Sequence, residues 1–193
     1  MTIQFKIQIH DIKKPPVWRR IIIPDNFTFH DLHITIQSIF KWHNEYPYQF
    51  QKYPFDKDWL VRIPDEEYEN MRGFRSNDAR KTNVIHFIKH TELKKFVYVY
   101  GFRDSWIHDI AVEEIDTQKQ IEHPICLAGK SASPSELYGG AEIYEEVKLS
   151  MDKDAITMFN LEDTNTELAN IRSDAPSFNS IKNVTYAQGY NNN

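Results

Sequence analysis

The stretch FVYVYGFRDSWIHDIAV, residues 96–112, decides the fold of this chain. It contains two runs rich in β-branched and aromatic residues, on either side of a short polar break at 103–105. Because such runs favour strands, we expect a β-hairpin over residues 96–114. One arm of the hairpin would then carry Tyr98, Tyr100 and Phe102. These side chains would lie opposite Trp106, His108 and Ile110, or the neighbours of those three residues, on the other arm.

Further strands are expected around this hairpin. Residues 2–10 alternate strictly between polar and apolar side chains, which is the period of a half-buried strand. A proline pair at 15–16 interrupts the pattern, and the β-branched run at 17–23 predicts a second strand. Shorter strands are expected at 59–63 and 84–88.

The clearest helix is expected over residues 29–42. Thr28 and Asp31 have the spacing of a capping box, in which each side chain binds the backbone N–H of the other residue. Apolar residues follow at helical spacing, so this helix should bury Leu32, Ile36 and Phe40 on the sheet.

The other segments place the chain in a fold class. Residues 64–82 are almost wholly polar and predict an exposed loop, and short helices are expected at 141–147 and 162–171. Since strands and helices are interspersed without βαβ alternation, we predict an α+β fold. The expected organisation is a single domain over residues 1–170, with a mixed or mostly antiparallel sheet packed against a few helices, followed by a polar, flexible tail over 171–193.

Composition limits the class of protein. The chain has 193 residues, of which 40% are apolar and 13% aromatic, enough to fill a core. The single cysteine, Cys126, excludes an intramolecular disulfide and indicates a reducing compartment. No stretch approaches the ~18 apolar residues of a membrane span. We therefore expect a soluble, cytoplasmic protein without a membrane partner.

The net charge of −5 is unevenly distributed. Residues 1–110 hold 17 Lys and Arg against 14 Asp and Glu, whereas residues 111–193 hold 6 against 14. The basic residues closest together in the first part are Lys13, Lys14, Arg19 and Arg20. This region is a candidate contact for a protein or nucleic-acid partner, although the alternative is a solvated surface, since the positive excess is small.

Motifs with a defined chemistry do not occur in the sequence. It has no phosphate-binding loop, dinucleotide fingerprint, HExxH or paired CxxC, so we predict neither cofactor nor metal. A thiol nucleophile at Cys126 would need activation by His108 or His123. Its neighbours Ile125 and Leu127 are apolar, however, and would keep the thiol protonated.

A second hypothesis places a pocket at the hairpin turn. Asp104, Trp106 and His108 could line its mouth. A metal site could combine the histidines at 33, 43 and 108 with Asp104 or Glu136, although the spacing does not support it. The competing interpretation is that Asp104 closes the turn through hydrogen bonds and that the histidines are structural.

Five segments also occur in an order and spacing known from other proteins. They are Pro15 to Ile21, Leu32 to Trp42, Tyr98 to His108, Pro124 to Gly129 and Pro134 to Tyr144. The chain thereby resembles the plasmid pRiA4b ORF-3-like family over residues 3–168. The resemblance implies a single α+β domain, often encoded on plasmids and mobile elements, with no established biochemical activity.

The chain departs from that family at several positions. Gly101 replaces a usual Asp and Arg103 a usual Gly, tyrosines at 46 and 48 replace a histidine pair, and a second cysteine near Ser133 is missing. If relatives use those side chains for a metal or a reaction, this chain has lost that chemistry. If the side chains are structural in the relatives, tyrosine and serine replace them at modest cost.

The residues retained in the motifs are the candidate binding residues. They are Trp18, Arg19, Arg20, His33, Asp104, Trp106, His108, Cys126 and Glu136. A structural account is also open, in which an arginine at 19 or 20 pairs with a carboxylate such as Asp104 beside packed tryptophans. We expect a non-enzymatic binding or accessory protein associated with plasmids or mobile elements. The alternatives are a metal-dependent or thiol-containing hydrolase-like enzyme with its pocket near Asp104 and His108, and a dimer formed through aromatics at 46–55.

Overall fold

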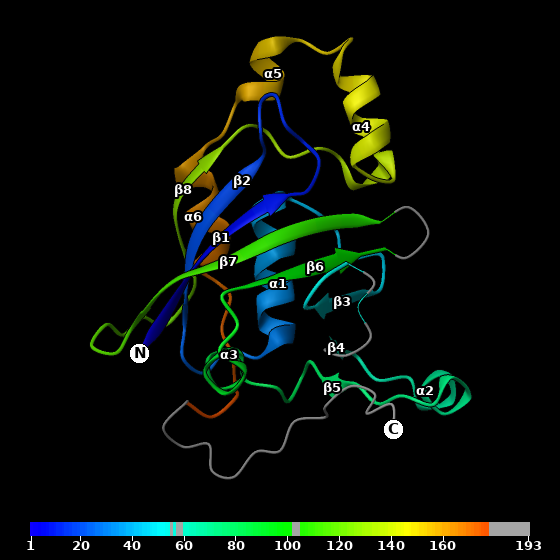
Figure 1. Ribbon diagram of the computed structural model, residues 1–193. Helices are drawn as coiled ribbons and strands as arrows, with labels where there is room; N and C mark the ends of the chain where they lie inside the picture. The colour runs from blue at the N-terminus through cyan, green and yellow to red at the C-terminus, as the bar shows by residue number, and fades with distance from the viewer. Residues whose placement is uncertain (55, 57–59, 102–104, 178–193) are drawn as a thin grey trace.

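The fold is built on one mixed sheet of eight strands (Figure 1). The computed structural model describes residues 1–54, 56, 60–101 and 105–177, and the count applies to them. Neighbouring strands are antiparallel except the parallel pair β4 and β5, and the order is β5-β4-β3-β6-β7-β1-β2-β8. The strands are β1 (Thr2–Ile9), β2 (Trp18–Pro24), β3 (Tyr48–Gln51), β4 (Leu60–Arg62), β5 (Asn77–Asp78), β6 (Lys95–Tyr100), β7 (Trp106–Asp116) and β8 (Ile125–Lys130). The predicted α+β class is confirmed.

The predicted hairpin forms the middle of the sheet. Strands β6 and β7 pair antiparallel, with Tyr98 opposite His108 and Tyr100 opposite Trp106, as expected. β3 pairs with the other edge of β6, and β1 with the other edge of β7. Residues 102–104 at the turn lie outside the described residues.

Helix α1 (Phe29–Phe40) covers the inner face of the sheet and lies behind the strands in Figure 1. Both hydrogen bonds of the capping box between Thr28 and Asp31 are present, so the start of the helix follows from local sequence. The helix ends where Lys41 adopts a left-handed conformation with φ 58°. The residues expected to face the sheet, Leu32, Ile36 and Phe40, are fully buried.

The strand expected at 84–88 is wrong, because these residues belong to helix α3 (Val84–Thr91). The side chain of Asn83 accepts a hydrogen bond of 2.8 Å from the backbone N–H of His86 and so caps the helix. The buried residues are Val84, Ile85, Phe87 and Ile88, which is helical spacing. β-branched residues at the first two positions favoured a strand locally, and packing of one helical face decided otherwise.

The polar segment 64–82 is not a plain loop. It contains helix α2 (Glu66–Arg72), which begins where the Asp65 side chain accepts a hydrogen bond of 3.0 Å from the Tyr68 N–H. It also contains β5, the parallel edge strand. The sequence signals missed β5 because this strand has two residues, and missed β8 because its partner β2 lies far away in the sequence. They missed β3 because prolines on both sides of it indicate turns.

The C-terminal part of the chain forms a series of short helices. They are η1 (Glu136–Tyr138), α4 (Ala141–Lys148), α5 (Lys153–Thr157) and α6 (Leu161–Leu168). In Figure 1, α4 and α5 stand beyond one end of the sheet, whereas α6 lies beside β8. Asn165 of α6 makes two hydrogen bonds, of 2.8 and 3.0 Å, to the backbone of Cys126, so that α6 is held against the edge strand.

The beginning of the predicted tail contacts the domain. The Ser173 hydroxyl donates to Asp31 at 2.7 Å, and the Asn26 side chain donates to the Ser173 carbonyl at 2.9 Å. The remainder of the predicted tail, residues 178–193, lies outside the described residues. No helix in the described ranges has the length and apolar character that crossing a membrane requires.

Candidate functional site

A cleft of about 420 Å³ lies between the end of α1, the segment 131–137 and helices α5 and α6. We call it the Arg19 cleft, after the arginine that lines it. Its apolar wall includes Ile39, Phe40, Leu137, Met158 and Phe159. The charged side chains that line it are Arg19, Lys41, Glu136 and Asp163. This size lies within the range of small-molecule sites.

Arg19 enters the cleft because of its position on β2. Successive side chains of a strand point to opposite faces, so Arg19 faces inward and is only 2% exposed. Its Nε donates to the Ile39 carbonyl at 3.2 Å, and Nη1 donates to the carbonyls of Trp18 and Lys130 at 2.8 and 3.0 Å. Nη2 donates to the Ser133 hydroxyl at 3.0 Å. These bonds hold the guanidinium in one orientation.

Two aromatic rings enclose the Arg19 guanidinium. Its central carbon lies 5.3 Å from the centre of the Phe40 ring and 4.2 Å from that of Phe159. Gly129, which is opposite Arg19 on β8, makes this packing possible. A Cβ atom at Gly129 would lie 2.6 Å from Cζ of Phe159 and 2.9 Å from Cδ of Arg19.

The charge of Arg19 has no carboxylate partner in the part of the chain that the structure describes. Its hydrogen bonds go to carbonyl and hydroxyl oxygens, and one N–H of Nη2 has no acceptor among those residues. Burial lowers the pKa of Arg19 to about 10, so that the group remains charged at neutral pH. The expected pairing of this arginine with Asp104 falls on a residue outside the described ranges.

Glu136 contributes a second buried charge to the cleft and is 4% exposed. One carboxylate oxygen accepts from the backbone N–H of His43 at 2.6 Å, and the other accepts from the Tyr100 hydroxyl at 2.7 Å. Its backbone carbonyl accepts from the indole N–H of Trp106 at 3.0 Å. Burial and this carboxylate together raise the pKa of Tyr100. The hairpin therefore positions the Glu136 side of the cleft.

His108 lies in the core rather than in a pocket. It is fully buried among Phe40, Trp42 and Tyr98, with ring centres 5.0 to 5.2 Å away. Neither ring nitrogen has a hydrogen-bond partner of good geometry among the described residues, although the backbone of Trp106 and Tyr98 lies near enough to oppose part of the pKa shift. Burial lowers the pKa of His108 to about 3. The ring therefore fills space as a neutral aromatic group.

His33 is also fully buried, but its ring nitrogens are satisfied. They make hydrogen bonds to the Tyr98 hydroxyl at 2.8 Å and to the Asn44 side chain at 2.7 Å. The ring stacks on Tyr48, with 3.6 Å between centres, and burial lowers its pKa to about 3. Gln37 also donates to the Tyr98 hydroxyl, at 2.9 Å, so the network joins α1 to the sheet.

The basic residues of the region from Lys13 to Arg20 do not share one surface. Arg19 points inward, whereas Arg20 points outward and binds Glu113 through two nitrogens, at 2.6 and 2.9 Å. Lys13 and Lys14 lie on the exposed connection between β1 and β2. The alternation of side chains along β2 explains the separation.

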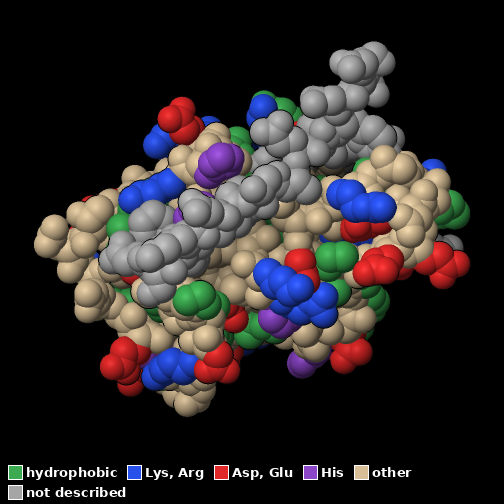
Figure 2. All heavy atoms as spheres, turned by 90° about the horizontal axis from the view of Figure 1, so that it is seen from below, with side chains coloured by type: hydrophobic (Ala, Val, Ile, Leu, Met, Phe, Trp, Pro, Cys, Tyr) green, Lys and Arg blue, Asp and Glu red, His purple; other side chains and the backbone are tan. Residues whose placement is uncertain are grey.

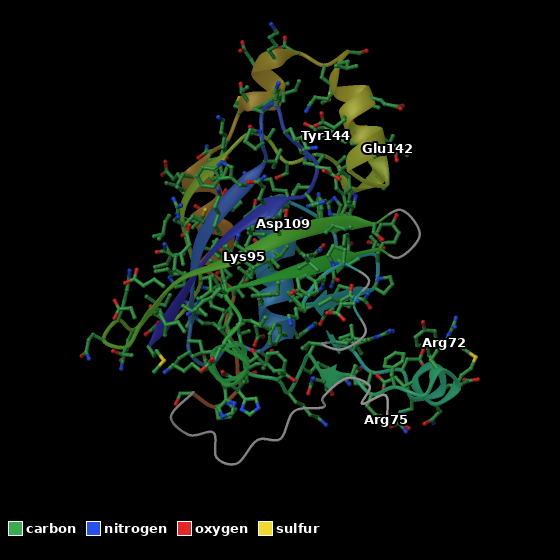
Figure 3. All side chains as sticks on the ribbon, in the orientation of Figure 1. Arg72, Arg75, Lys95, Asp109, Glu142 and Tyr144 are labelled. Atoms are coloured by element: carbon green, nitrogen blue, oxygen red, sulfur yellow. The ribbon has the colours of Figure 1, made fainter. Side chains whose placement is uncertain are left out.

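The outer face of the sheet carries charges of both signs. Trp18 is half-buried there, with Lys6 and Arg20 at 5.3 and 5.6 Å from its ring. Lys95 and Asp109 lie on the neighbouring strands (Figure 3). A different side of the molecule, seen from below in Figure 2, also has basic and acidic side chains close together.

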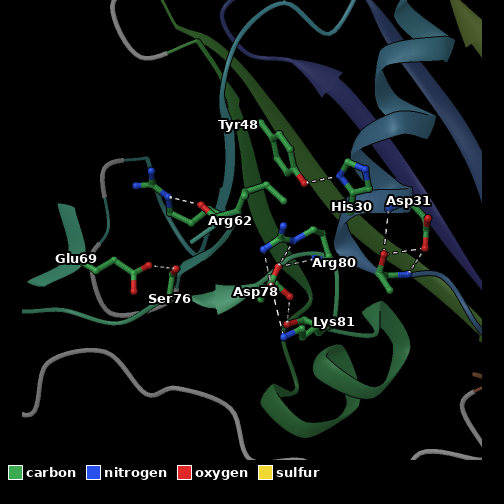
Figure 4. A network of polar contacts seen from close by, with 12 residues as sticks. His30, Asp31, Tyr48, Arg62, Glu69, Ser76, Asp78, Arg80 and Lys81 are labelled. Carbon is green, nitrogen blue, oxygen red and sulfur yellow. Dashed lines mark hydrogen bonds and ion pairs between the residues drawn. The ribbon is translucent and has the colours of Figure 1, made fainter. Parts of the chain in front are cut away.

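A separate polar network lies at the opposite end of α1 from the Arg19 cleft (Figure 4). His30 and the Tyr48 hydroxyl are 2.9 Å apart, and Arg80 binds Asp78 at 3.0 and 3.1 Å. Burial, with the charge of Asp78, raises the pKa of Tyr48. Asp78 and Arg80 neutralise each other's charge, and none of these four residues lines the cleft.

Cys126 is 2% exposed, and its thiol is 3.4 Å from the Ala128 carbonyl. Burial raises the pKa of this thiol, which keeps it in the less reactive protonated form. Within the described ranges, no three His, Cys, Asp or Glu side chains converge to hold a metal ion.

The structure therefore divides the candidate residues. Arg19 and Glu136 meet in one cleft, whereas His33, Trp106, His108 and Cys126 are packed in the core. Trp18 and Arg20 lie on the outer face, and Asp104 is outside the described residues. Sequence analysis missed Phe159 and Ser133 as cleft residues.

Comparison with known proteins gives a consistent assignment. The family described as plasmid pRiA4b ORF-3-like protein matches residues 1–171. The uncharacterized protein y4hQ of Sinorhizobium fredii is 29% identical over 145 residues, which cover 75% of this chain and 70% of that protein. A crystal structure of a protein of unknown function from Methanosarcina mazei has a TM-score of 0.66 and 25% identity, covering 84% of this chain and 96% of its own.

Proposed function

The chain belongs to the plasmid pRiA4b ORF-3-like family, and since the relatives compared above have no assigned activity, we propose a function from the geometry. We propose that the protein is a non-enzymatic binding domain whose Arg19 cleft holds a small molecule with an anionic group. The observation that carries this proposal is the buried, charged guanidinium of Arg19, which faces a cleft without a carboxylate partner among the described residues.

A buried cation is costly unless an anion offsets it. The carbonyl and hydroxyl oxygens around Arg19 provide only partial negative charge. A carboxylate or phosphate placed in the cleft would supply the missing charge and accept the remaining Nη2 hydrogen bond. The same arrangement supports binding rather than catalysis, because the buried thiol of Cys126 and the buried ring of His108 do not line the cleft.

The test compares carboxylates with matched neutral amides. Calorimetry would measure the dissociation constants of butanoate, hexanoate and benzoate against butanamide, hexanamide and benzamide. We expect the carboxylates to bind at least about tenfold more tightly, since charge-assisted hydrogen bonds are about twice as strong as neutral ones. Equal binding of acids and amides would remove the proposal.

Two variants locate the binding. Ala155 lies on α5, is exposed and lines the cleft, so Ala155→Trp should fill the cleft without removing a hydrogen bond. Lys153→Trp, at an exposed position of the same helix outside the cleft, is the matched control. Carboxylate binding should be lost in A155W and kept in K153W. Binding that survives in A155W would place the ligand elsewhere.

The family name and the single cysteine support an accessory role for plasmids or mobile elements in the cytoplasm, which we also propose. Deleting the gene from a plasmid that carries it should raise the rate of plasmid loss. If the role includes nucleic acid, the exposed Lys13 and Lys14 are its contacts, and K13A/K14A should lower affinity at low salt. An unchanged loss rate contradicts the accessory role.

A further inference from the structure

We infer that the ligand of the Arg19 cleft is a zwitterion, an apolar chain with a carboxylate that binds Arg19 and an ammonium group that binds Glu136. This inference rests on the proposed function and names its ligand class. The observation that carries it is a second buried charge in the same cleft.

The Glu136 carboxylate has neutral donors only. His43 contributes a backbone N–H and Tyr100 a hydroxyl, and no Lys, Arg or His among the described residues forms an ion pair with Glu136. Two carboxylate oxygens can accept about four hydrogen bonds, so that capacity for further donors remains. An ammonium group offers three donors and the opposite charge.

Arg19 and Glu136 do not neutralise each other, although both line the cleft and both are more than nine-tenths buried. Each is held by its own hydrogen bonds. Ser133 and three carbonyls orient Arg19, while His43 and Tyr100 orient Glu136. Two opposite charges that are fixed apart in one cleft form a preorganised site for a ligand that carries both charges.

The cleft that holds the two charges also has an apolar wall. Ile39, Phe40 and Phe159 contribute to it, and Leu137 and Met158 remain 80% and 73% exposed. A ligand with a hydrocarbon chain between its charged groups would cover these side chains and remove them from water. A cleft of about 420 Å³ has room for a short chain of this kind.

The exposed charges of the cleft are a natural control. Lys41 already pairs with Glu167 at 3.6 Å, and Asp163 is exposed to water. Solvent screens interactions with such groups, so they contribute little to binding. Asp163 therefore differs from Glu136 in burial while sharing its charge and its cleft.

The experiment uses ω-amino acids of increasing length, namely 4-aminobutanoate, 6-aminohexanoate and 8-aminooctanoate, each compared with its N-acetyl derivative in calorimetric titrations. Acetylation removes the positive charge and keeps the carboxylate. We expect one chain length to bind at least about tenfold more tightly than its N-acetyl derivative. The best length reports the distance that the two charges span.

Glu136→Gln should remove this preference and keep carboxylate binding. Its amide oxygen can still accept from the His43 N–H, but its NH2 group cannot replace the acceptor of the Tyr100 hydroxyl, whose oxygen already accepts from the backbone N–H groups of Glu45 and Tyr46. We therefore expect a folded variant of lower stability, which thermal unfolding would check. Asp163→Asn should keep the preference.

Three outcomes would overturn the inference. If no ω-amino acid binds more tightly than its N-acetyl derivative, the inference of a zwitterionic ligand is wrong, while the proposed anion-binding function stands. If the preference survives in E136Q or disappears in D163N, the ammonium group does not bind Glu136. If no carboxylate binds at all, the proposed function itself fails.

Discussion

The guanidinium carbon of Arg19 lies 4.2 Å from the centre of the Phe159 ring, which places a residue of the second strand against one from the C-terminal part of the chain. The ring covers one face of the guanidinium, and Phe40 of α1 approaches it as well, at 5.3 Å. Arg19 thereby becomes part of a cleft wall instead of an exposed basic residue. The cleft is completed only when the segment that carries Phe159 packs on β2 and β8.

Gly129→Ala should disturb this contact. The added Cβ would lie 2.6 Å from Cζ of Phe159, so the half-buried ring must move away from the guanidinium. We expect a loss of stability of about 1–3 kcal/mol, the usual range for overpacking, and weaker carboxylate binding. Urea unfolding and calorimetry measure the two effects. Phe159→Leu, combined with G129A, should cost less than the sum of the two single variants, and strict additivity would contradict the clash.

The two buried histidines should respond differently to replacement by phenylalanine. His33→Phe leaves the side chain of Asn44 without its partner and removes one bond from the Tyr98 hydroxyl, so we expect a loss of about 1–3 kcal/mol. His108→Phe removes no hydrogen bond and should change stability by less than about 1.5 kcal/mol. Chemical denaturation of both variants provides the measurement. An equally severe loss in H108F would indicate a polar role for that ring.

Stability should fall on mild acidification. Burial lowers the pKa values of His33 and His108 to about 3, below the ~6.5 of an unfolded histidine. Because the folded state holds both rings neutral, their contribution is complete above pH ~6.5 and decreases as the pH falls toward 3. Two protons taken up on unfolding give a slope of about 2.7 kcal/mol per pH unit within this window.

Urea unfolding at pH 7, 6 and 5 would test this dependence. Few carboxylates titrate in that interval, since an unperturbed Asp or Glu has a pKa of about 4. H108F should keep about half of the slope, because His33 then remains as a fully buried histidine with a pKa of about 3. Equal stability at pH 7 and pH 5 would show that the buried rings do not control acid sensitivity.

Cys126 should react slowly in the native protein. It is 2% exposed and burial raises its pKa, so both access and thiolate formation are limited. Iodoacetamide labelling, followed by mass spectrometry, should be at least about a hundredfold slower in buffer than in concentrated urea, which corresponds to a local opening cost of roughly 3 kcal/mol. Fast native labelling would favour the thiol hypothesis that the sequence left open.

Local patterns determined much of the fold. The alternation at 2–10, the capping box at 28–31 and the two runs around 103–105 each depend on neighbouring residues, and each correctly located an element. The pairing of the two hairpin strands could also be predicted from the sequence, because a short turn leaves few possible registers. Where the local preference opposed the tertiary packing, as at Val84 and Ile85 of α3, local patterns predicted the wrong element.

The cleft was decided only by the tertiary structure. Arg19 and Glu136 were both candidates from the sequence, but nothing local indicated that they line one cleft or that His108 and Cys126 lie outside it. The physical reason is that charge compensation and burial depend on groups far apart along the chain. Arg19 meets Phe159 and Ser133, and Glu136 meets Tyr100, only after β2, β8 and the hairpin have assembled into the sheet.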